Sequence, residues 1–309
     1  MQKKVTLKDI AKQTGVSVAT VSYVLNNVQN QTIADETRTR ILDTAKTLGY
    51  VPNLAARSLV KQQSNLIGLL INMPKRSSSW RLLRHSVLIH EIEAELNKNG
   101  YHLIIHSLDA TAPKLDIIAE RKLDGVIVVD AIGEHFHHIS RYFPYGVPLL
   151  IVDSLIDDPL FHQVIYDYGD ALAQISELRN QPENYYVVLD NYNNQELIAH
   201  ITDLIPLPKE HIHIMSSELE LQRFLNQQLG RKGIIENEGI ALLAAKYTSS
   251  QELTIICTSG ISALLPPEAQ VITFSESKGV VVVKKLLQLI TSSTVDSDAT
   301  IKTYKIKAE

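Results

Sequence analysis

Near its N-terminus the chain carries the stretch Val5-Thr-Leu-Lys-Asp-Ile-Ala-Lys-Gln-Thr-Gly-Val-Ser-Val-Ala-Thr-Val-Ser-Tyr-Val-Leu-Asn26. Thr6 and Asp9 form a pair of the capping-box type that begins a helix, and Gly15 is the residue type that ends one. The serine two positions later is suited to cap a second short helix, Val18–Leu25. Because two short helices joined by a tight turn form a helix-turn-helix, the spacing predicts that motif here.

A third helix completes the predicted N-terminal unit. It covers about Asp35–Leu48 and places Ile41, Leu42 and Ala45 at helical spacing. These side chains are expected to close a small three-helix core with the apolar faces of the first two helices.

The quoted stretch resembles the DNA-binding head of the lactose-repressor (LacI/GalR) family of transcription regulators. The resemblance is nearly unbroken over about residues 5–72 and continues through Thr37-Arg38, Leu48-Gly-Tyr-Val-Pro-Asn53 and Ala55-Ala-Arg-Ser-Leu59, the last of which is similar to the family's hinge helix. It implies a sequence-specific transcription regulator, a repressor, that binds a near-palindromic operator in double-stranded DNA as a homodimer.

The resemblance also implies which residues contact DNA. The positions that hold backbone phosphates share hydroxyl side chains, which are suited to bind phosphate oxygens, and they are Thr6, Ser17, Thr20, Ser22, Thr37 and Tyr50. Val18 and Ala19 match the two base-reading positions, where small apolar side chains touch a thymine methyl but cannot form a bidentate hydrogen bond to a base. The further DNA contacts that the resemblance implies are Leu7, Tyr23, Asn26, Asn53, Ala56 and Leu59.

Two positions in the head depart from the family pattern. Tyr23 stands where many relatives carry an arginine that contacts guanine. Ala34 stands where a serine usually caps the third helix, and the loss of such a cap typically costs ~1 kcal/mol.

Leu59 matches the leucine that wedges into the minor groove and kinks the operator. Since a helix as short as Asn53–Val60 is marginal alone in water, it is expected to fold only when paired with its copy in a dimer.

The formal charge differs between the N-terminal segment and the rest of the chain. Residues 1–63 hold nine basic and four acidic residues, a formal charge of +5, whereas the remaining 246 residues hold 21 basic and 30 acidic residues, a formal charge of −9. A small basic head on a larger acidic body is typical of a nucleic-acid reader with a separate sensor or assembly domain.

The length and composition of the chain exclude several other classes of protein. The chain has 309 residues, a length that suggests two or three domains, and 45% of them are hydrophobic. No apolar run is long enough for a membrane span, and no secretory signal opens the sequence, so we expect a cytoplasmic protein with no membrane partner. The single cysteine, Cys257, excludes an internal disulfide and any cysteine-based zinc site.

Beyond residue 64 apolar runs alternate with helical patterns. Such alternation predicts doubly wound parallel sheets, here two of them. The expected fold class is therefore α/β, with an N-terminal all-α helix-turn-helix head and a two-lobed body. The resemblance implies a periplasmic-binding-protein-like (Rossmann-like) body with a ligand cleft between the lobes.

The predicted domain boundaries follow from these patterns. Residues 1–52 form the DNA-binding head and 53–64 the hinge helix and linker. Residues 65–309 form an effector-binding and dimerisation domain. Its first lobe is expected over about 65–154 and 276–291, and its second over about 155–275 and 292–309.

The effector is less well indicated than the DNA. Relatives that bind sugars usually place an arginine after the run Tyr185–Asp190 and an aspartate after Thr254–Cys257, and neither is present. Two interpretations stay open: a small-molecule effector, a sugar or related metabolite, or a body that serves as a dimerisation or protein-interaction module without one. By position in the family's fold, the candidate effector-binding residues are Trp80, Asp130, Asp153, Asn191 and Ser259.

Motifs for catalysis or metal binding are weak in this sequence. Glu134-His-Phe-His-His138 places two histidines one helical turn apart, but no further ligand is identifiable for a metal ion. The sequence contains no Gly-x-Ser-x-Gly elbow, no Gly-x-Gly-x-x-Gly motif and no P-loop. We therefore expect no enzyme activity, no metal and no cofactor.

Overall fold

The computed structural model describes residues 5–25, 31–50, 63–73, 78–108, 122–140 (side chains excepted at 137–139), 147–291 and 303–309. It divides the chain into two compact units, Met1–Ser64 and Asn65–Glu309, each of which is described by itself. The expected DNA contacts Asn26, Asn53, Ala56 and Leu59 lie outside the described residues, as does the expected hinge helix. No helix among the described residues is both long and apolar enough to cross a membrane.

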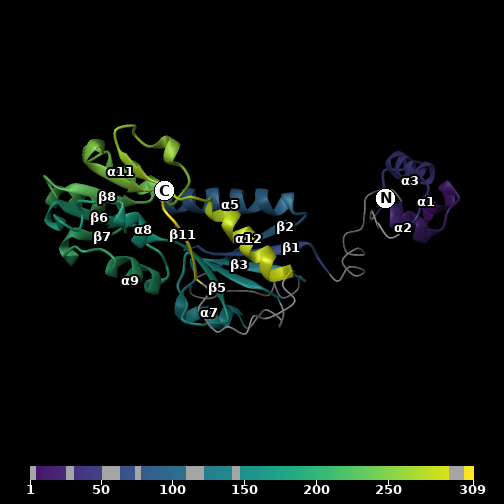
Figure 1. Cartoon of the computed structure of the whole chain (residues 1–309), viewed down its shortest axis with the longest axis horizontal. Helices are drawn as coiled ribbons and strands as arrows, with labels where there is room; N and C mark the ends of the chain where they lie inside the picture. The colour runs from purple at the N-terminus through teal and green to yellow at the C-terminus, as the bar shows by residue number, and fades with distance from the viewer. Residues whose placement is uncertain are drawn as a thin grey trace. The chain divides into compact units, whose positions relative to one another are not determined.

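The N-terminal unit is the expected bundle of three helices, α1 (Leu7–Thr14), α2 (Val18–Leu25) and α3 (Asp35–Thr47) (Figure 1). Each helix turns its apolar stripe inward because these side chains lose water only where the helices meet. The core that results is small, and its buried members are Ile10, Ala11, Val21, Val24, Ile41 and Ala45.

The helix ends of this unit follow from individual residues. The Asp9 carboxylate accepts the backbone N–H of Thr6 at 2.8 Å, which satisfies one donor at the start of α1. Gly15 has φ +71°, a left-handed conformation that suits glycine, and its N–H donates to the carbonyl of Ala11. Ala34 precedes α3 without a side-chain cap, as the residue type requires.

The body contains two parallel sheets in the described residues. The first has the strand order β11-β5-β4-β3-β1-β2, and the second has the order β10-β9-β8-β6-β7. The first-sheet strands are β1 (Leu66–Asn72), β2 (His102–Leu108), β3 (Gly125–Val129), β4 (Leu149–Val152), β5 (His162–Tyr166) and β11 (Thr303–Ile306). The second-sheet strands are β6 (Tyr185–Leu189), β7 (Ile212–Ile214), β8 (Lys232–Glu236), β9 (Leu253–Ile256) and β10 (Gln270–Ile272).

Helices cover both sheets. Beside the first sheet, α5 (Ser79–Lys98) packs against α12 (Lys278–Thr291), and α7 (Gly133–Ser140) lies on the opposite side (Figure 1). The second sheet carries α10 (Glu218–Gln227) and α11 (Glu238–Ala244) on one face, with α8 (Tyr168–Ala173) and α9 (Gln195–Asp203) on the other. The α/β fold class expected from the alternating runs is thus confirmed.

The expected division into lobes is wrong at two strands. The sequence pattern places residues 155–166 and 303–306 in the second lobe, but β5 pairs with β4, and β11 pairs with β5, in the first sheet. An apolar run shows that a strand is buried but not which sheet it joins, because the pairing depends on the path of the chain. The sequence pattern does not predict β11 as a strand at all.

The histidine-rich segment around Glu134 forms helix α7. Phe136 is fully buried and meets Phe161 edge-on, with ring centroids 4.8 Å apart. This burial explains the helix, since it anchors a histidine-rich segment that shows little apolar periodicity.

Candidate functional site

The start of α2 presents small side chains to solvent. Ser17, Val18 and Ala19 are exposed, and Tyr23 is 38% exposed one turn later. The opposite side of the helix, with Val21 and Val24, is buried in the core of the head. The two expected base-reading residues therefore lie at the accessible N-terminal end of this helix.

Hydroxyl groups flank this end of α2. The Ser17 hydroxyl accepts the backbone N–H of Thr20 at 3.0 Å and lies 2.8 Å from the Thr20 hydroxyl. A helix N-terminus with exposed hydroxyls is suited to hold a phosphate, because its free N–H groups carry partial positive charge. This arrangement supports the expected phosphate contacts of these two residues.

The side chains of the other expected DNA contacts are half-buried or already hydrogen-bonded. The Thr6 hydroxyl donates to the Asp9 carboxylate at 2.7 Å, so it must give up that bond to donate to a phosphate. Leu7 and Tyr50 are half-buried and pack against the core of the head. Ser22 and Thr37 are also half-buried.

In the body, a charged group lies where the two lobes meet. The Arg84 guanidinium, on α5 of the first lobe, donates to the Asp190 carboxylate at 2.6 Å, just beyond β6 of the second lobe. It also lies 3.5 Å from the carboxylate of Asp130, which follows β3, and stacks 4.4 Å from the ring centre of Tyr192. Burial and the neighbouring Arg84 lower the pKa of His85 to about 3, so its imidazole is neutral.

Backbone and amide groups strengthen the same junction. Asn193 donates its side-chain amide to Asp130 at 2.9 Å and to the carbonyl of Asn72 at 3.0 Å, and its backbone N–H also bonds Asp130. Asn194 donates to the carbonyl of Ala131 at 3.1 Å. Polar groups of the second lobe thereby pair with the strand ends of the first.

A third buried carboxylate lies behind this junction. Glu236, at the end of β8, accepts the hydroxyls of Tyr168 and Tyr192 and the backbone N–H of Asp190. Burial and the nearby charge of Asp190 raise its pKa to about 7, despite these hydrogen bonds.

This shift predicts a pH-dependent stability. Because the folded state raises the pKa of Glu236, it binds this proton more tightly than the unfolded chain. The stabilisation is complete below the unfolded pKa and is lost as the pH rises through about 7. We expect Glu236→Gln to flatten the fall in melting temperature of the body between pH 5 and 8, because it removes the charge and keeps an oxygen acceptor for the hydroxyls of Tyr168 and Tyr192, although not for the backbone N–H of Asp190. At pH 8 the variant should melt a few degrees above the parent, in the range of ~3–8 °C.

The measurement is thermal unfolding across this pH range, with Glu210→Gln as the control at an exposed carboxylate. Parallel curves for the parent and Glu236→Gln would show that Glu236 does not titrate between pH 5 and 8.

A cavity of about 240 Å³ opens beside Arg84. The Lys278 ammonium lies in its wall, 2.6 Å from the Asp153 carboxylate and 3.9 Å from the ring centre of Tyr166. Among the described residues, three buried oxygens in this wall have no hydrogen-bond partner: Oδ2 of Asp153, Oγ1 of Thr258 and Oγ of Ser259. Tyr166 stacks on Phe274 with ring centres 3.9 Å apart, which adds an aromatic surface.

The cavity brings together two of the five candidate effector residues. Asp153 and Ser259 line it. Trp80 instead belongs to the hydrophobic core of the second lobe, and Asp130 is committed to Arg84 and Asn193. Asn191 accepts a hydrogen bond from Arg81 through its backbone carbonyl.

Sequence reasoning missed both cations of this region. Arg84 continues the buried stripe of Leu88, Ile92 and Leu96 along α5 at intervals of four residues. An arginine in such a stripe is a signal, because a charge is rarely buried unless it is paired. Lys278, at the first residue of α12, carries no comparable signal in the sequence.

Comparison with known proteins supports the two-part description. Residues 6–53 match the family described as bacterial regulatory proteins, lacI family. The transcriptional repressor PurR of Mannheimia succiniciproducens is 31% identical over 48% of this chain and 43% of its own length. The ribose operon repressor of Bacillus subtilis is 34% identical over 49% of this chain and 44% of its own length. The matched part of the chain therefore spans less than half the length of these two relatives.

Other matches extend over most of the chain. The sucrose operon repressor of Streptococcus mutans is 26% identical over 87% of this chain and 81% of its own length. Among solved structures, the lac repressor dimer bound to operator and the anti-inducer ONPF superposes with a TM-score of 0.74 at 18% identity, covering 99% of this chain and 98% of that one. The complex of the regulator CelR with cellobiose superposes with a TM-score of 0.58 at 13% identity over the same shares. At these identities the two structures establish the fold.

Proposed function

Because the chain belongs to the lacI family of bacterial regulatory proteins, we propose that it is a transcription repressor that binds a specific operator in double-stranded DNA as a homodimer. The observation that carries this proposal is the family match over residues 6–53, which coincides with a folded head whose second helix exposes Val18 and Ala19. The domain division into a head, a hinge and an effector-binding body belongs to the same proposal. So do its place in the cytoplasm and a role without catalysis.

Selection of bound sequences from random DNA with the purified full-length protein tests this function. The expected product is a near-palindromic sequence with two half-sites, since a homodimer presents two copies of α2. Specific binding should exceed binding to random DNA by at least ~1,000-fold at physiological salt. Recovery of no common sequence would contradict the proposal.

We assign the effector site to the cavity between Arg84 and Lys278. The unpaired oxygens of Asp153, Thr258 and Ser259 can accept hydrogen bonds from hydroxyl or amide donors, and the Tyr166–Phe274 pair offers an apolar face. The cavity wall contains both cations and carboxylates, which favours a neutral ligand over a strongly charged one. A neutral sugar has this combination of hydroxyls and an apolar ring face. The relatives named for ribose and sucrose operons are consistent with that chemistry.

A screen by thermal unfolding tests this assignment. Neutral monosaccharides and disaccharides, including ribose and sucrose, are added to the purified protein, and a ligand should raise the melting temperature by mass action. No shift with any sugar, nucleobase or phosphosugar would favour the alternative, in which the body serves for assembly alone.

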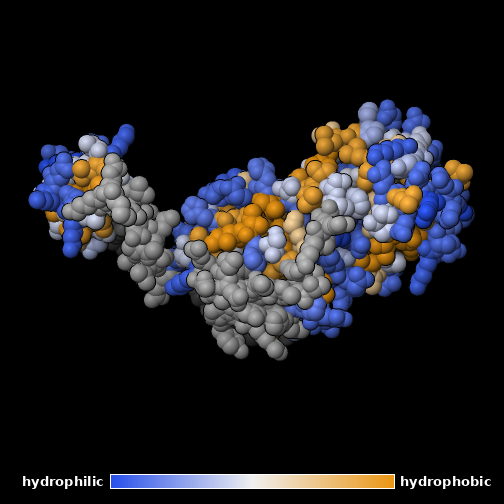
Figure 2. Space-filling view, turned by 180° about the vertical axis from the view of Figure 1, so that it is seen from behind, coloured by the Kyte–Doolittle hydropathy of each residue, from blue (hydrophilic) through white to orange (hydrophobic). Residues whose placement is uncertain are grey.

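The first lobe offers a surface for the second copy of the chain. Figure 2 shows apolar atoms gathered on the side of this lobe that faces the viewer. Among the described residues of the lobe, Leu82 and Leu83 of α5 and Ile105 of β2 are 40–50% exposed. Exposed apolar surface of this kind is typical of an assembly site.

Introducing charge on this surface should separate the dimer. In the double variant Leu82→Glu/Leu83→Glu, two carboxylates would have to be desolvated at the interface, so we expect a monomer at micromolar concentration. Its operator affinity should fall by at least ~30-fold, because one head contacts only one half-site. Analytical ultracentrifugation and operator titration measure the two effects.

The matched control is Leu229→Glu, at an 83% exposed leucine of the second lobe. This variant should remain a dimer. A dimeric Leu82→Glu/Leu83→Glu protein would place the interface elsewhere.

A further inference from the structure

The body's own Arg84 side chain occupies the centre of the junction between the lobes. Its guanidinium reaches Asp190 of the second lobe at 2.6 Å. The helix that carries it, α5, packs against α12 and β2 of the first lobe, and only its first turn, with Trp80, packs against α11 of the second. Asp130, at the end of β3, lies 3.5 Å from the same group. Arg84 is 2% exposed and the two carboxylates are 0% exposed, so water screens none of these charges.

The carboxylates depend on this cation. Without the guanidinium the two buried carboxylates would keep only neutral hydrogen-bond donors, and a buried guanidinium without carboxylates would itself be an unpaired charge. The amide of Asn237 adds a hydrogen bond to Asp190 at 2.9 Å, and the ring of Tyr192 covers one face of the guanidinium. The groups of both lobes thus surround Arg84 as a binding site surrounds a ligand.

The position of Arg84 within the fold agrees with that view. Asp130 follows β3 of the first sheet, and Asp190 follows β6 of the second. In open parallel sheets, ligands bind beyond the carboxyl ends of the strands. The guanidinium therefore stands at a place where a bound molecule would bridge the two sheets.

We propose that Arg84 acts as a built-in ligand, whose guanidinium occupies the junction and holds the two lobes closed in the absence of any bound molecule. The bonds of Asn193 to Asp130 and Asn72 close the same side of the junction. The 240 Å³ cavity lies on another side of Arg84 and includes it in its wall. An effector therefore enters a body whose lobes are already closed, and it contacts the Arg84 guanidinium directly. This consequence for regulation rests on the proposed function.

A side chain that acts as a ligand should be replaceable by a free one. Arg84→Ala removes the atoms of ethylguanidinium, so this compound is the probe. We expect the full-length Arg84→Ala protein to melt roughly 10 °C below the parent. Ethylguanidinium at 20 mM should restore at least a third of that loss, whereas ethylammonium at the same ionic strength, which lacks the planar fork, should restore little.

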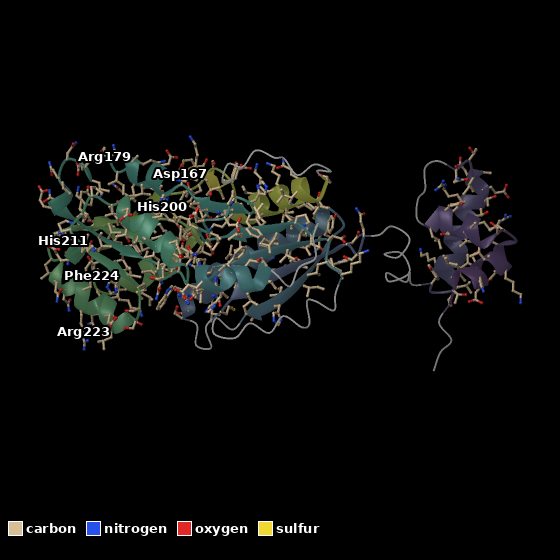
Figure 3. The ribbon with its side chains drawn as sticks, turned by 90° about the horizontal axis from the view of Figure 1, so that it is seen from below. Asp167, Arg179, His200, His211, Arg223 and Phe224 are labelled. Carbon is tan, nitrogen blue, oxygen red and sulfur yellow. The ribbon has the colours of Figure 1, made fainter. Side chains whose placement is uncertain are left out.

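The matched control variant is Arg223→Ala. Arg223 is exposed on α10, at the edge of the second lobe where Figure 3 labels it. Neither this variant nor the parent should be stabilised by ethylguanidinium. Because ethylguanidinium would also refill the place of a purely structural ion pair, rescue shows that the guanidinium is held as a ligand, and closure needs a separate readout.

Hydrogen exchange reports closure directly. In Arg84→Ala the backbone amides of Asn193 and Leu155, which donate across the junction to Asp130 and Asn194, should lose protection, and ethylguanidinium should return it. If Arg84→Ala does not fold, Arg84→Met/Asp190→Asn removes the charges of the 2.6 Å pair while keeping the volume and leaves Asp130 with its bonds from Asn193. It should show the same loss of protection at residues that bond across the junction.

Three outcomes would overturn the inference: equal responses of parent and variant to ethylguanidinium, no rescue in a folded variant, or exchange that increases only within α5. The failure of the proposed function would be visible separately, as a lack of operator binding, because none of these measurements uses DNA.

Discussion

Val18→Glu is expected to lower operator affinity by at least ~100-fold while leaving the head folded. Val18 is the first residue of α2 and is 40% exposed, so the longer side chain meets no steric conflict in the free protein. A carboxylate in the first turn of a helix even stabilises the helix slightly. Against DNA the same carboxylate would face phosphates and lose its water, and ~2.7 kcal/mol of such repulsion corresponds to the expected loss.

The measurement is a titration of the selected operator by fluorescence anisotropy at fixed salt. Val18→Thr is the matched control, because threonine has nearly the same shape and carries no charge. It should bind within ~10-fold of the parent and alter base preference at one position in each half-site. Parental affinity in Val18→Glu would mean that the start of α2 does not face the operator.

The head shows what sequence can predict about such a unit. Thr6, Gly15 and Ser17 act within four residues along the chain, so their effects on the ends of α1 and α2 are local and readable. The sequence predicts Thr6 and Asp9 as a cap but does not reveal that the bond between their side chains competes with a phosphate for the Thr6 hydroxyl. The reason is that the orientation of a hydroxyl depends on the folded geometry.

The body shows where local patterns stop being sufficient. Strands such as β3 and β6 are continuous apolar runs, because parallel strands are covered on both faces, and the runs predicted them well. The strand β11 is only four residues long and alternates Tyr304, Lys305 and Ile306, so nothing in its composition marks it as buried. Its place beside β5 is decided by a pairing more than 130 residues distant in the sequence.

Two of the five effector-binding residues expected from the sequence line the cavity that we propose as the effector site. Asp153 and Ser259 follow strand ends whose position in the family's fold could be counted along the chain, and both line the cavity. Asp130 also follows a strand end, but Arg84 and Asn193 use its carboxylate. That competition arises between side chains of different lobes, which no spacing in the sequence records.

Ser259→Phe should abolish the response to the effector while sparing DNA binding. Ser259 is 3% exposed and its hydroxyl lies in the cavity wall without a partner among the described residues. A phenylalanine ring at this position occupies much of the 240 Å³ that a ligand needs. The neutral sugar that stabilises the parent should therefore bind at least ~100-fold more weakly, a loss of ~2.7 kcal/mol. Operator affinity without the sugar should stay within ~3-fold of the parent, since the head is a separate unit.

Two controls make this result specific to the cavity. Ser259→Ala removes only the hydroxyl, so it should weaken sugar binding by no more than ~10-fold, the value of one neutral hydrogen bond. Ser249→Phe places the same ring at an exposed serine of the second lobe and should leave sugar binding unchanged. Thermal unfolding over a range of sugar concentrations yields the three affinities. An undiminished shift in Ser259→Phe would place the effector outside this cavity, whereas equal losses in Ser259→Phe and Ser259→Ala would mean that the hydroxyl, and not the space, decides binding.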